Sequence, residues 1–335
     1  MNVSTSGQAV SGLDITCATK SCITVQPGLF NVRISGNTIH DCAQDGIRFI
    51  RPDTTGASYT TGVTISNNRI WAVGQTSTLG NDVTIYANSA LVVDNDLTGA
   101  PNDAIDMWGD RLIFRHNTIH DIRNTFGRHN DAFQTWNGIT PDDGAQGHPV
   151  TNLVIERNTI VNITGWSAHV LVGEGPRMHD WSFRNNLVRN IGSIGIILNV
   201  NGETNPPNPG IVNVTVAGNT FVDAGPNDTI EFNAGTTGVA ADNIFVNCPN
   251  PYFVKTLTNV RRDYDLSWGM TPALVEKHAR RADPLFVSSS NFHLRAGSRA
   301  IDSGDKGRLV PVRTTDLDGE ATVGVVDRGA FESQG

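Results

Sequence analysis

The stretch NLVIERNTI, Asn152–Ile160, decides the fold, because the same phrase recurs along most of the chain. Each copy places two alternate apolar residues a few positions before an asparagine, and a further apolar residue after it. The anchoring asparagines are Asn37, Asn68, Asn95, Asn117, Asn158, Asn186, Asn219 and Asn243. A phrase that repeats at intervals of a few dozen residues indicates a solenoid, in which each repeat is one coil.

Each phrase consists of two short strands that meet at a tight bend. Apolar residues alternate on both sides of the asparagine, which is the pattern of a half-buried strand. A tight bend often needs one residue at positive φ, and asparagine tolerates that conformation better than any residue except glycine. Coils that stack at the strand spacing of about 4.8 Å would bring equivalent amides into hydrogen-bonding contact. We therefore expect the anchoring asparagines to be structural, in one internal ladder at the bends.

The spacing of the asparagines separates the coils from their loops. The shortest spacing, 22 residues from Asn95 to Asn117, suffices for three short strands and three turns. The longest, 41 residues from Asn117 to Asn158, leaves an excess in the segment 121–150. Loops carry the function of most solenoids, so this segment is the expected wall of an active site. A second excess contains the polar segment 199–210.

The sequence therefore predicts an all-β protein, a right-handed parallel β-helix of about ten coils closed by a C-terminal capping tail. We place the β-helix at residues 1–268 and the tail at 269–335, packed on the β-helix rather than forming an independent domain. One amphipathic helix is expected, at Pro272–Arg281.

Composition narrows the classes of function. Charged residues make up 17% of the 335 residues and the net charge is −8, which argues against disorder and against a general nucleic-acid binder. No apolar run is long enough to span a membrane. Motifs for nucleotides, zinc proteases and serine hydrolases are missing, so no organic cofactor is expected. Among the four cysteines, Cys17 and Cys22 are close enough in sequence to form a bridge.

A third strand recurs a few residues after each asparagine bend, with copies such as NDAIDMW at Asn102 and NDAFQTW at Asn130. Aligning the copies gives an outward column of Arg48, Asp106, Gln134, Val170, Ile197 and Glu231, with Trp108 and Trp136 two residues further on. Polar and aromatic side chains in register on one face form a groove suited to a linear polymer.

At this point the chain resembles the pectin-lyase-like superfamily of parallel β-helices. The asparagine phrases cover roughly residues 31–250, and ADPLFV at Ala282 and DRGAFE at Asp327 resemble the closing segment of secreted bacterial β-helix proteins. The resemblance implies the fold, a polysaccharide partner, and secretion or display on a bacterial cell surface, although no signal peptide opens the sequence. It does not fix the activity, because this fold carries lyases, hydrolases, epimerases and adhesins.

Three acidic residues from neighbouring coils, Asp103, Asp106 and Asp131, are expected to cluster, because equivalent positions on adjacent coils lie about 5 Å apart. Such carboxylates can supply acid and base if their environments separate their pKa values. Asp106 and Asp131 can also hold Ca²⁺, which prefers oxygen ligands. The competing interpretation is that Asp103 and Asp131 only cap the turn that enters each strand.

Basic groups concentrate beside these acids, which would suit an acidic sugar polymer. The groups are Arg48, Arg128, His129 and His148. β-Elimination on a uronate needs a neutralised carboxylate, a base for the C5 proton and a stabilised leaving oxygen. We assign His129 as base with Arg128 as its rival, Arg48 or Arg128 to the carboxylate, and substrate contacts to Arg48, Gln134, Trp108, Trp136 and His148. His169 is expected to be a satisfied core histidine.

Two other functions remain open. A glycoside hydrolase needs two suitably spaced carboxyl groups, and NDAIDMW resembles a catalytic strand of polygalacturonases, with Asp103, Asp106 and Asp131 as the acids. The next strand departs from that pattern, because Asn130 stands where a second acid is expected. The last alternative is a binding or adhesive β-helix without catalysis, which would use the tryptophans to stack on sugar rings.

Overall fold

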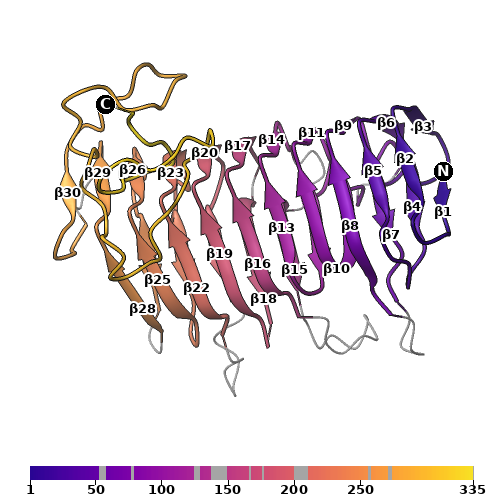
Figure 1. The fold of residues 1–335 in the computed structure, drawn as a ribbon, viewed down its shortest axis with the longest axis horizontal. Helices are drawn as coiled ribbons and strands as arrows, with labels where there is room; N and C mark the ends of the chain where they lie inside the picture. Colours follow the sequence, from indigo (N-terminus) through magenta and orange to yellow (C-terminus); the bar gives the residue numbers. More distant parts are fainter. Residues whose placement is uncertain are drawn as a thin grey trace.

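A computed structural model of the chain describes residues 1–52, 58–76, 79–123, 129–136, 149–165, 167–175, 177–199, 210–255, 258–270 and 274–334. Every regular element in these ranges is a β-strand, and strands on successive coils pair in parallel, in a 19-stranded and an 11-stranded sheet. Figure 1 shows the strands side by side along the long axis, with the N-terminus at one end and the tail folded over the other. The predicted right-handed parallel β-helix is confirmed.

The strands form three faces, which we call A, B and C in the order in which each coil visits them. Face A contains β1 (Asn2–Val3), β4 (Ile23–Val25), β7 (Ile47–Phe49), the first part of β10 (Val83–Val93), β12 (Ile105–Trp108), β15 (Asn130–Trp136), β18 (Ala168–Glu174), β21 (Ile196–Leu198), β24 (Ile230–Phe232) and β27 (Tyr252–Val254). Face B contains β2 (Ala9–Ser11), β5 (Arg33–Ser35), β8 (Thr60–Ser66), the second part of β10, β13 (Leu112–Arg115), β16 (Thr151–Glu156), β19 (His179–Arg184), β22 (Val212–Ala217), β25 (Thr237–Ala241) and β28 (Asn259–Asp263). Face C contains β3 (Asp14–Cys17), β6 (Thr38–Cys42), β9 (Arg69–Trp71), β11 (Asp96–Thr98), β14 (Thr118–His120), β17 (Thr159–Ile163), β20 (Leu187–Ile191), β23 (Thr220–Ala224), β26 (Ile244–Val246), β29 (Leu266–Trp268) and β30 (Arg280–Arg281).

The asparagine ladder exists as predicted, at the bend between faces B and C. Asn117 donates from its backbone N and from Nδ2 to Oδ1 of Asn158, at 2.9 and 3.0 Å. Asn158 donates in the same way to Asn186, and the pattern runs from Asn37 to Asn243, where Asp265 takes the last place. Every rung is buried, so each amide satisfies groups that water cannot reach.

The sequence predicts positive φ at the ladder asparagine. In the structure the residue before the asparagine has positive φ instead. Asn67, Asp94 and His116 have φ of 55°, 58° and 54°, and Gly36 has 63°. This position is at least partly exposed in Asn67, Asp94 and His116, and several residue types occur there. The asparagine that follows is left free to point its amide into the ladder.

The core is a set of aligned apolar columns inside the three faces. On face A, Val83 pairs in register with Ile47 and Ile105, and Ile105 pairs with Phe133. All of these side chains are fully buried. Each contributes about 1.5–3 kcal/mol relative to an exposed position, which is why every coil must keep its apolar pattern.

The outward column on face A differs from the expected one at two positions. Thr84 lies between Arg48 and Asp106, and Asp106 pairs with Gln134. Gln134 then pairs with Val172, not with Val170. A shift of two residues preserves the alternation of side chains, so the sequence pattern does not detect it.

The structure settles the disulfide, which the sequence left open, and one further expectation, the helix, is wrong. The disulfide joins Cys22 to Cys42, and Cys17 is free, because Cys22 and Cys42 meet where adjacent coils turn from face C into face A. The described part of the expected helix, 274–281, contains no helix and ends in β30, which pairs with β29. Leu274 packs against the core but the next residue, Val275, is 93% exposed, so the apolar residues of this segment do not form one buried helical face.

The tail lies against face C and is fixed by buried arginines. The guanidinium of Arg328 donates to the backbone oxygens of Asp265 and Ser303, at 2.7 and 3.0 Å. Arg313 donates to Oδ1 of Asn185 at 2.9 Å, and Ala330 N donates to Oγ1 of Thr220 at 2.9 Å. The parallel pairing of the coils continues to Arg281, while the division at residue 268 stays a prediction. No helix in the described ranges is long and apolar enough to cross a membrane.

Candidate active site

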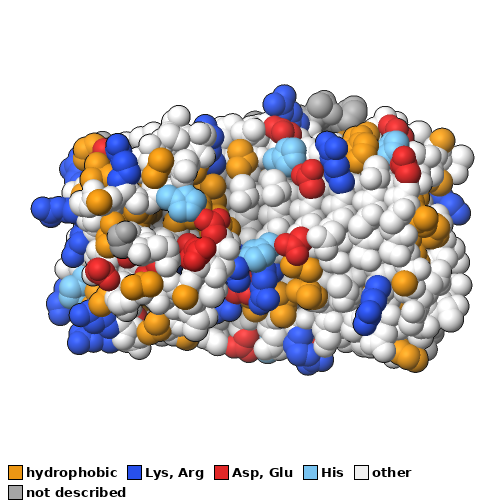
Figure 2. Space-filling model, turned by 45° about the horizontal axis from the view of Figure 1, so that its top comes forward, with side chains coloured by type: hydrophobic (Ala, Val, Ile, Leu, Met, Phe, Trp, Pro, Cys, Tyr) orange, Lys and Arg blue, Asp and Glu red, His pale blue; other side chains and the backbone are white. Residues whose placement is uncertain are grey.

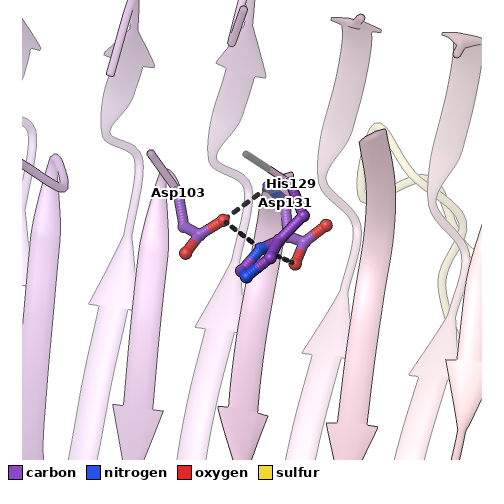
Figure 3. Close-up of side chains that lie close together, drawn as sticks. All are labelled: Asp103, His129 and Asp131. Carbon is purple, nitrogen blue, oxygen red and sulfur yellow. Dashed lines mark hydrogen bonds and ion pairs between the residues drawn. The ribbon is translucent and has the colours of Figure 1, made fainter. Parts of the chain in front are cut away.

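Asp103, His129 and Asp131 meet at the turn from face C into face A. Asp103 precedes β12, and Asp131 lies in β15 on the next coil. Asp131 N donates to Oδ1 of Asp103 at 2.7 Å, so the Asp103 carboxyl group holds the next coil at the turn. Figure 3 shows the His129 ring beside both carboxyl groups, with Nδ1 at 3.9 Å from Asp103 Oδ1 and 3.4 Å from Asp131 Oδ2.

His169 joins this cluster from β18 and was not assigned to the site from the sequence. It pairs in register with Asp131, and its Nδ1 lies 2.6 Å from Asp131 Oδ1. It is buried and satisfied, as expected, but its partner is a site carboxylate rather than a core group. The correct register of β18 would have revealed this contact, because it places His169 directly beside Asp131.

Exposure divides the cluster into a buried support and one accessible group. Asp103 and Asp131 are 0% exposed, whereas 46% of the His129 side chain is exposed. The imidazole is therefore the group of this cluster that a substrate can reach. The turn-capping role considered for Asp103 is real, since Asp103 binds the backbone of Asp131, and the same carboxylate also faces His129.

Asp106 leaves its strand outward as expected but is covered, at 6% exposure. Asn81 Nδ2 donates to Asp106 Oδ2 at 2.7 Å. Burial raises the pKa of Asp106 to about 7, although the Asn81 hydrogen bond acts in the opposite direction. Burial also raises the pKa of Asp103 well above its usual range, and the nearby Asp106 and Asp131 carboxylates add to the shift. The three acids therefore cluster, as the sequence predicts.

Asn81 connects the cluster to Arg48. Its Oδ1 accepts from Asp103 N at 3.1 Å, and its backbone N donates to Asp45 Oδ1 at 3.1 Å. Asp45 in turn accepts from Arg48 Nη1 at 3.0 Å, and 47% of the Arg48 side chain is exposed. Neither Asn81 nor Asp45 was assigned to the site from the sequence, although each stands two residues before an inward strand residue, as Asp103 and Asp131 do.

A pocket of about 290 Å³ opens beside His129. Its walls include Glu174 from β18 and also Gln134 and Trp136, whose roles as substrate contacts stay predictions. Trp108 does not line it. That ring is 5% exposed, stacks on Tyr86 at 4.4 Å between centroids, and donates from Nε1 to Trp136 O. The expectation that Trp108 stacks on a sugar is therefore replaced by a packing role under Trp136.

Two predicted site residues, Arg128 and His148, lie outside the described residues. Their predicted roles, as rival base and as substrate contact, stay predictions. The polar segment 199–210 also lies almost wholly outside the described ranges.

The donor set does not match the expected calcium site. The described groups that share a metal-sized space are Asp103, His129 and Asp131, and Asp106 is not among them. Ca²⁺ takes six to eight oxygen ligands, whereas this set offers two carboxylates and an imidazole nitrogen. Calcium binding by Asp106 and Asp131 thus gains no support from the geometry, and we derive no step through a metal.

No family model and no curated protein matches the sequence. Among solved structures, the chain is similar to pectate lyase Pel9A, at 14% identity and a TM-score of 0.48, covering 92% of this chain and 77% of that one. It is also similar to a GH87 alpha-1,3-glucanase from Streptomyces thermodiastaticus, at 16% identity and a TM-score of 0.43, covering 80% of this chain and 59% of that one. It is similar to the PL6 alginate lyase AlyGC at 12% identity and a TM-score of 0.39, covering 84% of this chain and 50% of that one. The chain thus spans less than two thirds of the last two, and these structures are parallel β-helix proteins.

Proposed function

We propose that this protein is an extracellular enzyme that cleaves a uronate-containing polysaccharide by β-elimination, with His129 as the base. The observation that carries the proposal is the pairing of one exposed imidazole with two buried carboxyl groups, Asp103 and Asp131. A carboxylate behind an imidazole orients the ring and stabilises the imidazolium that forms when it takes a proton, and Asp131, the nearer group at 3.4 Å, is placed for that role.

The reaction follows from that arrangement. Nδ1 of His129 faces the carboxylates, so Nε2 takes the C5 proton of the uronate. The electron pair of the broken C–H bond forms the C4–C5 double bond, and the glycosidic oxygen leaves from C4 with the C–O electron pair. That oxygen takes a proton from water, and the imidazolium returns its proton to the solvent. The products are a new reducing-chain end and an unsaturated uronate, and no oxidant or reductant is needed.

Arg48 is proposed to bind a substrate carboxylate on one flank. It lies two strands away from Asp106 on the outward column, with Thr84 on the strand between them. Two strand spacings correspond to about 10 Å, so Arg48 would contact a neighbouring sugar unit of a bound chain. Its exposed guanidinium, fixed by Asp45, suits bidentate recognition of a carboxylate.

Glycoside hydrolysis is the second candidate, favoured by the raised pKa of Asp106. A carboxylic acid that is half protonated near neutral pH can protonate a leaving oxygen. Hydrolysis also needs a second carboxylate that contacts the sugar or its water. Asp103 and Asp131 have no exposed surface, which is why we rank elimination first.

The disulfide supports the extracellular assignment independently of the site. Cys22 and Cys42 are bonded, and such bonds persist in oxidising compartments such as the periplasm or the cell exterior.

The test is incubation with polygalacturonate, alginate and neutral polysaccharides, followed by ultraviolet absorbance and a reducing-end assay. Elimination produces both signals, hydrolysis only reducing ends, and a pure binding protein neither. His129→Ala should reduce turnover about 10²–10⁴-fold, the usual contribution of a positioned base. His179→Ala is the matched control, because the His179 side chain is also 46% exposed and next to an aspartate, but on face B. Equal activity of both variants would refute His129 as the base.

A further inference from the structure

A second, larger pocket lies where the C-terminal tail meets the bend between faces B and C. Its volume is about 520 Å³, within the range of ordinary ligand sites. Figure 2 shows that histidine and acidic side chains gather on this side of the molecule, next to the tail. The carboxylate cluster around His129 belongs to the other bend, from face C into face A.

The floor of this tail pocket is apolar and comes from both parts of the chain. Leu187 on β20 lies with Phe292, Leu317 and Phe331 of the tail, and all four are largely buried. Apolar surface of this kind can cover the C–H face of a sugar ring, and a rim of polar groups can bind its hydroxyls.

The rim carries donors and acceptors in balance. Asp94, His116 and Arg157 come from the bend, and His293 and Asp318 come from the tail. His293 Nε2 lies 2.6 Å from Asp318 Oδ2, so these two groups hold each other in place. Two acids stand against one arginine, so the rim has no excess positive charge to select an anion.

Part of the rim's hydrogen-bonding capacity is unused by the protein. Nε2 of His116 and Nε of Arg157 have no hydrogen-bond partner within the described ranges. The tail also approaches Arg157 closely, since a Cβ on Gly319 would lie 2.6 Å from its Nη2. These two atoms are themselves buried, so the polar groups open to a ligand are the exposed parts of the same side chains, and 32% of the His116 side chain is exposed.

The pocket is built before any ligand arrives. The tail that forms one wall is held by Arg313, Arg328 and Ala330 through hydrogen bonds to the solenoid. The opposite wall is the outside of the asparagine ladder, including Asn117. A preformed site loses less conformational entropy on binding than a flexible one.

From these observations we propose that the tail pocket is a second carbohydrate-binding site, which takes one or two uncharged sugar rings of a polysaccharide. It would hold the protein on a polysaccharide that contains neutral sugars, away from the candidate active site. The inference does not depend on the proposed elimination chemistry.

The test is native electrophoresis of the full chain in gels that contain dextran, galactan, mannan or polygalacturonate. We expect retardation by at least one neutral polymer. Ser290→Trp should raise the apparent Kd at least tenfold, because Ser290 is exposed and lines the pocket. Ser289→Trp, one residue away on the exposed surface and outside the pocket, is the matched control. Thr118→Trp blocks the pocket from the opposite wall, should the first variant fold poorly.

Three results would overturn the proposal. These are no retardation by any neutral polymer, retardation by polygalacturonate alone, and undiminished retardation of folded Ser290→Trp and Thr118→Trp. The outcome is separable from the proposed catalysis, because His129→Ala should lose cleavage while its retardation in the neutral gels is unchanged.

Discussion

Replacing Asn158 by leucine should destabilise the protein far more than the same change at Asn37, because the two positions satisfy different numbers of buried groups. Oδ1 of Asn158 accepts both the backbone N–H and an Nδ2–H of Asn117, in a fully buried environment. Leucine leaves both donors without an acceptor. An unsatisfied buried donor costs about 1–3 kcal/mol, so Asn158→Leu should lower the free energy of unfolding by about 2–6 kcal/mol.

Asn37 lies at the end of the ladder, where the loss is smaller. Its Oδ1 accepts only the backbone N–H of Leu13, and Leu13 as a residue is 41% exposed, so water can take the place of the lost acceptor. Asn37→Leu should therefore cost about 1 kcal/mol. The assay is urea unfolding followed by circular dichroism, with linear extrapolation to water.

Asn259→Leu is the control for the effect of leucine itself. Asn259 is exposed on β28 and outside the ladder, so its replacement should change the free energy of unfolding by less than about 0.5 kcal/mol. If Asn158→Leu and Asn37→Leu cost the same, or if neither costs more than Asn259→Leu, the ladder does not stabilise the fold in the way argued above.

Three further outcomes follow from the same structure. Because burial raises the pKa of Asp106 and of Asp242 to about 7, the folded state keeps protons that the unfolded chain loses above about pH 4. The resulting stabilisation of the folded state is complete below the unfolded pKa and is lost as pH rises toward 7. It amounts to up to about 4 kcal/mol per group. Asp242→Asn removes one such group and should therefore flatten the dependence of melting temperature on pH. Cys42→Ser should lower the free energy of unfolding by about 3 kcal/mol relative to the oxidised wild type, since the bridge closes a separation of 20 residues. Under reducing conditions the variant and the wild type should be equally stable. Asp106→Asn should reduce turnover at least a hundredfold if its proton serves the leaving oxygen, and a kcat equal to wild type would assign Asp106 to structure alone.

The sequence was sufficient for the fold because a solenoid repeats its local physics in every coil. The asparagine phrases, the apolar alternation and the shortest spacing between Asn95 and Asn117 each describe one coil completely. Stacking then needs no further information, since each coil contacts chiefly its two neighbours. The clustering of Asp103, Asp106 and Asp131 followed from the same repeat.

The tertiary structure decided what local periodicity does not encode. Alternation has a period of two, so it could not distinguish Val170 from Val172, and the contact between His169 and Asp131 was missed for that reason. Sequence distance left the bridge open, with Cys17 and Cys22 close enough to pair, whereas the stacking of the coils brings Cys42 to Cys22.

Burial and the tail pocket were likewise beyond the sequence. Whether a carboxyl group at a turn is exposed depends on the coils above and below it, which leave Asp103 buried and His129 accessible. The tail pocket joins Arg157 to Asp318, residues that no repeat relates to each other. Repetition fixes contacts between equivalent residues, while sites arise where the chain departs from the repeat, and those contacts exist only once the solenoid and its tail have folded together.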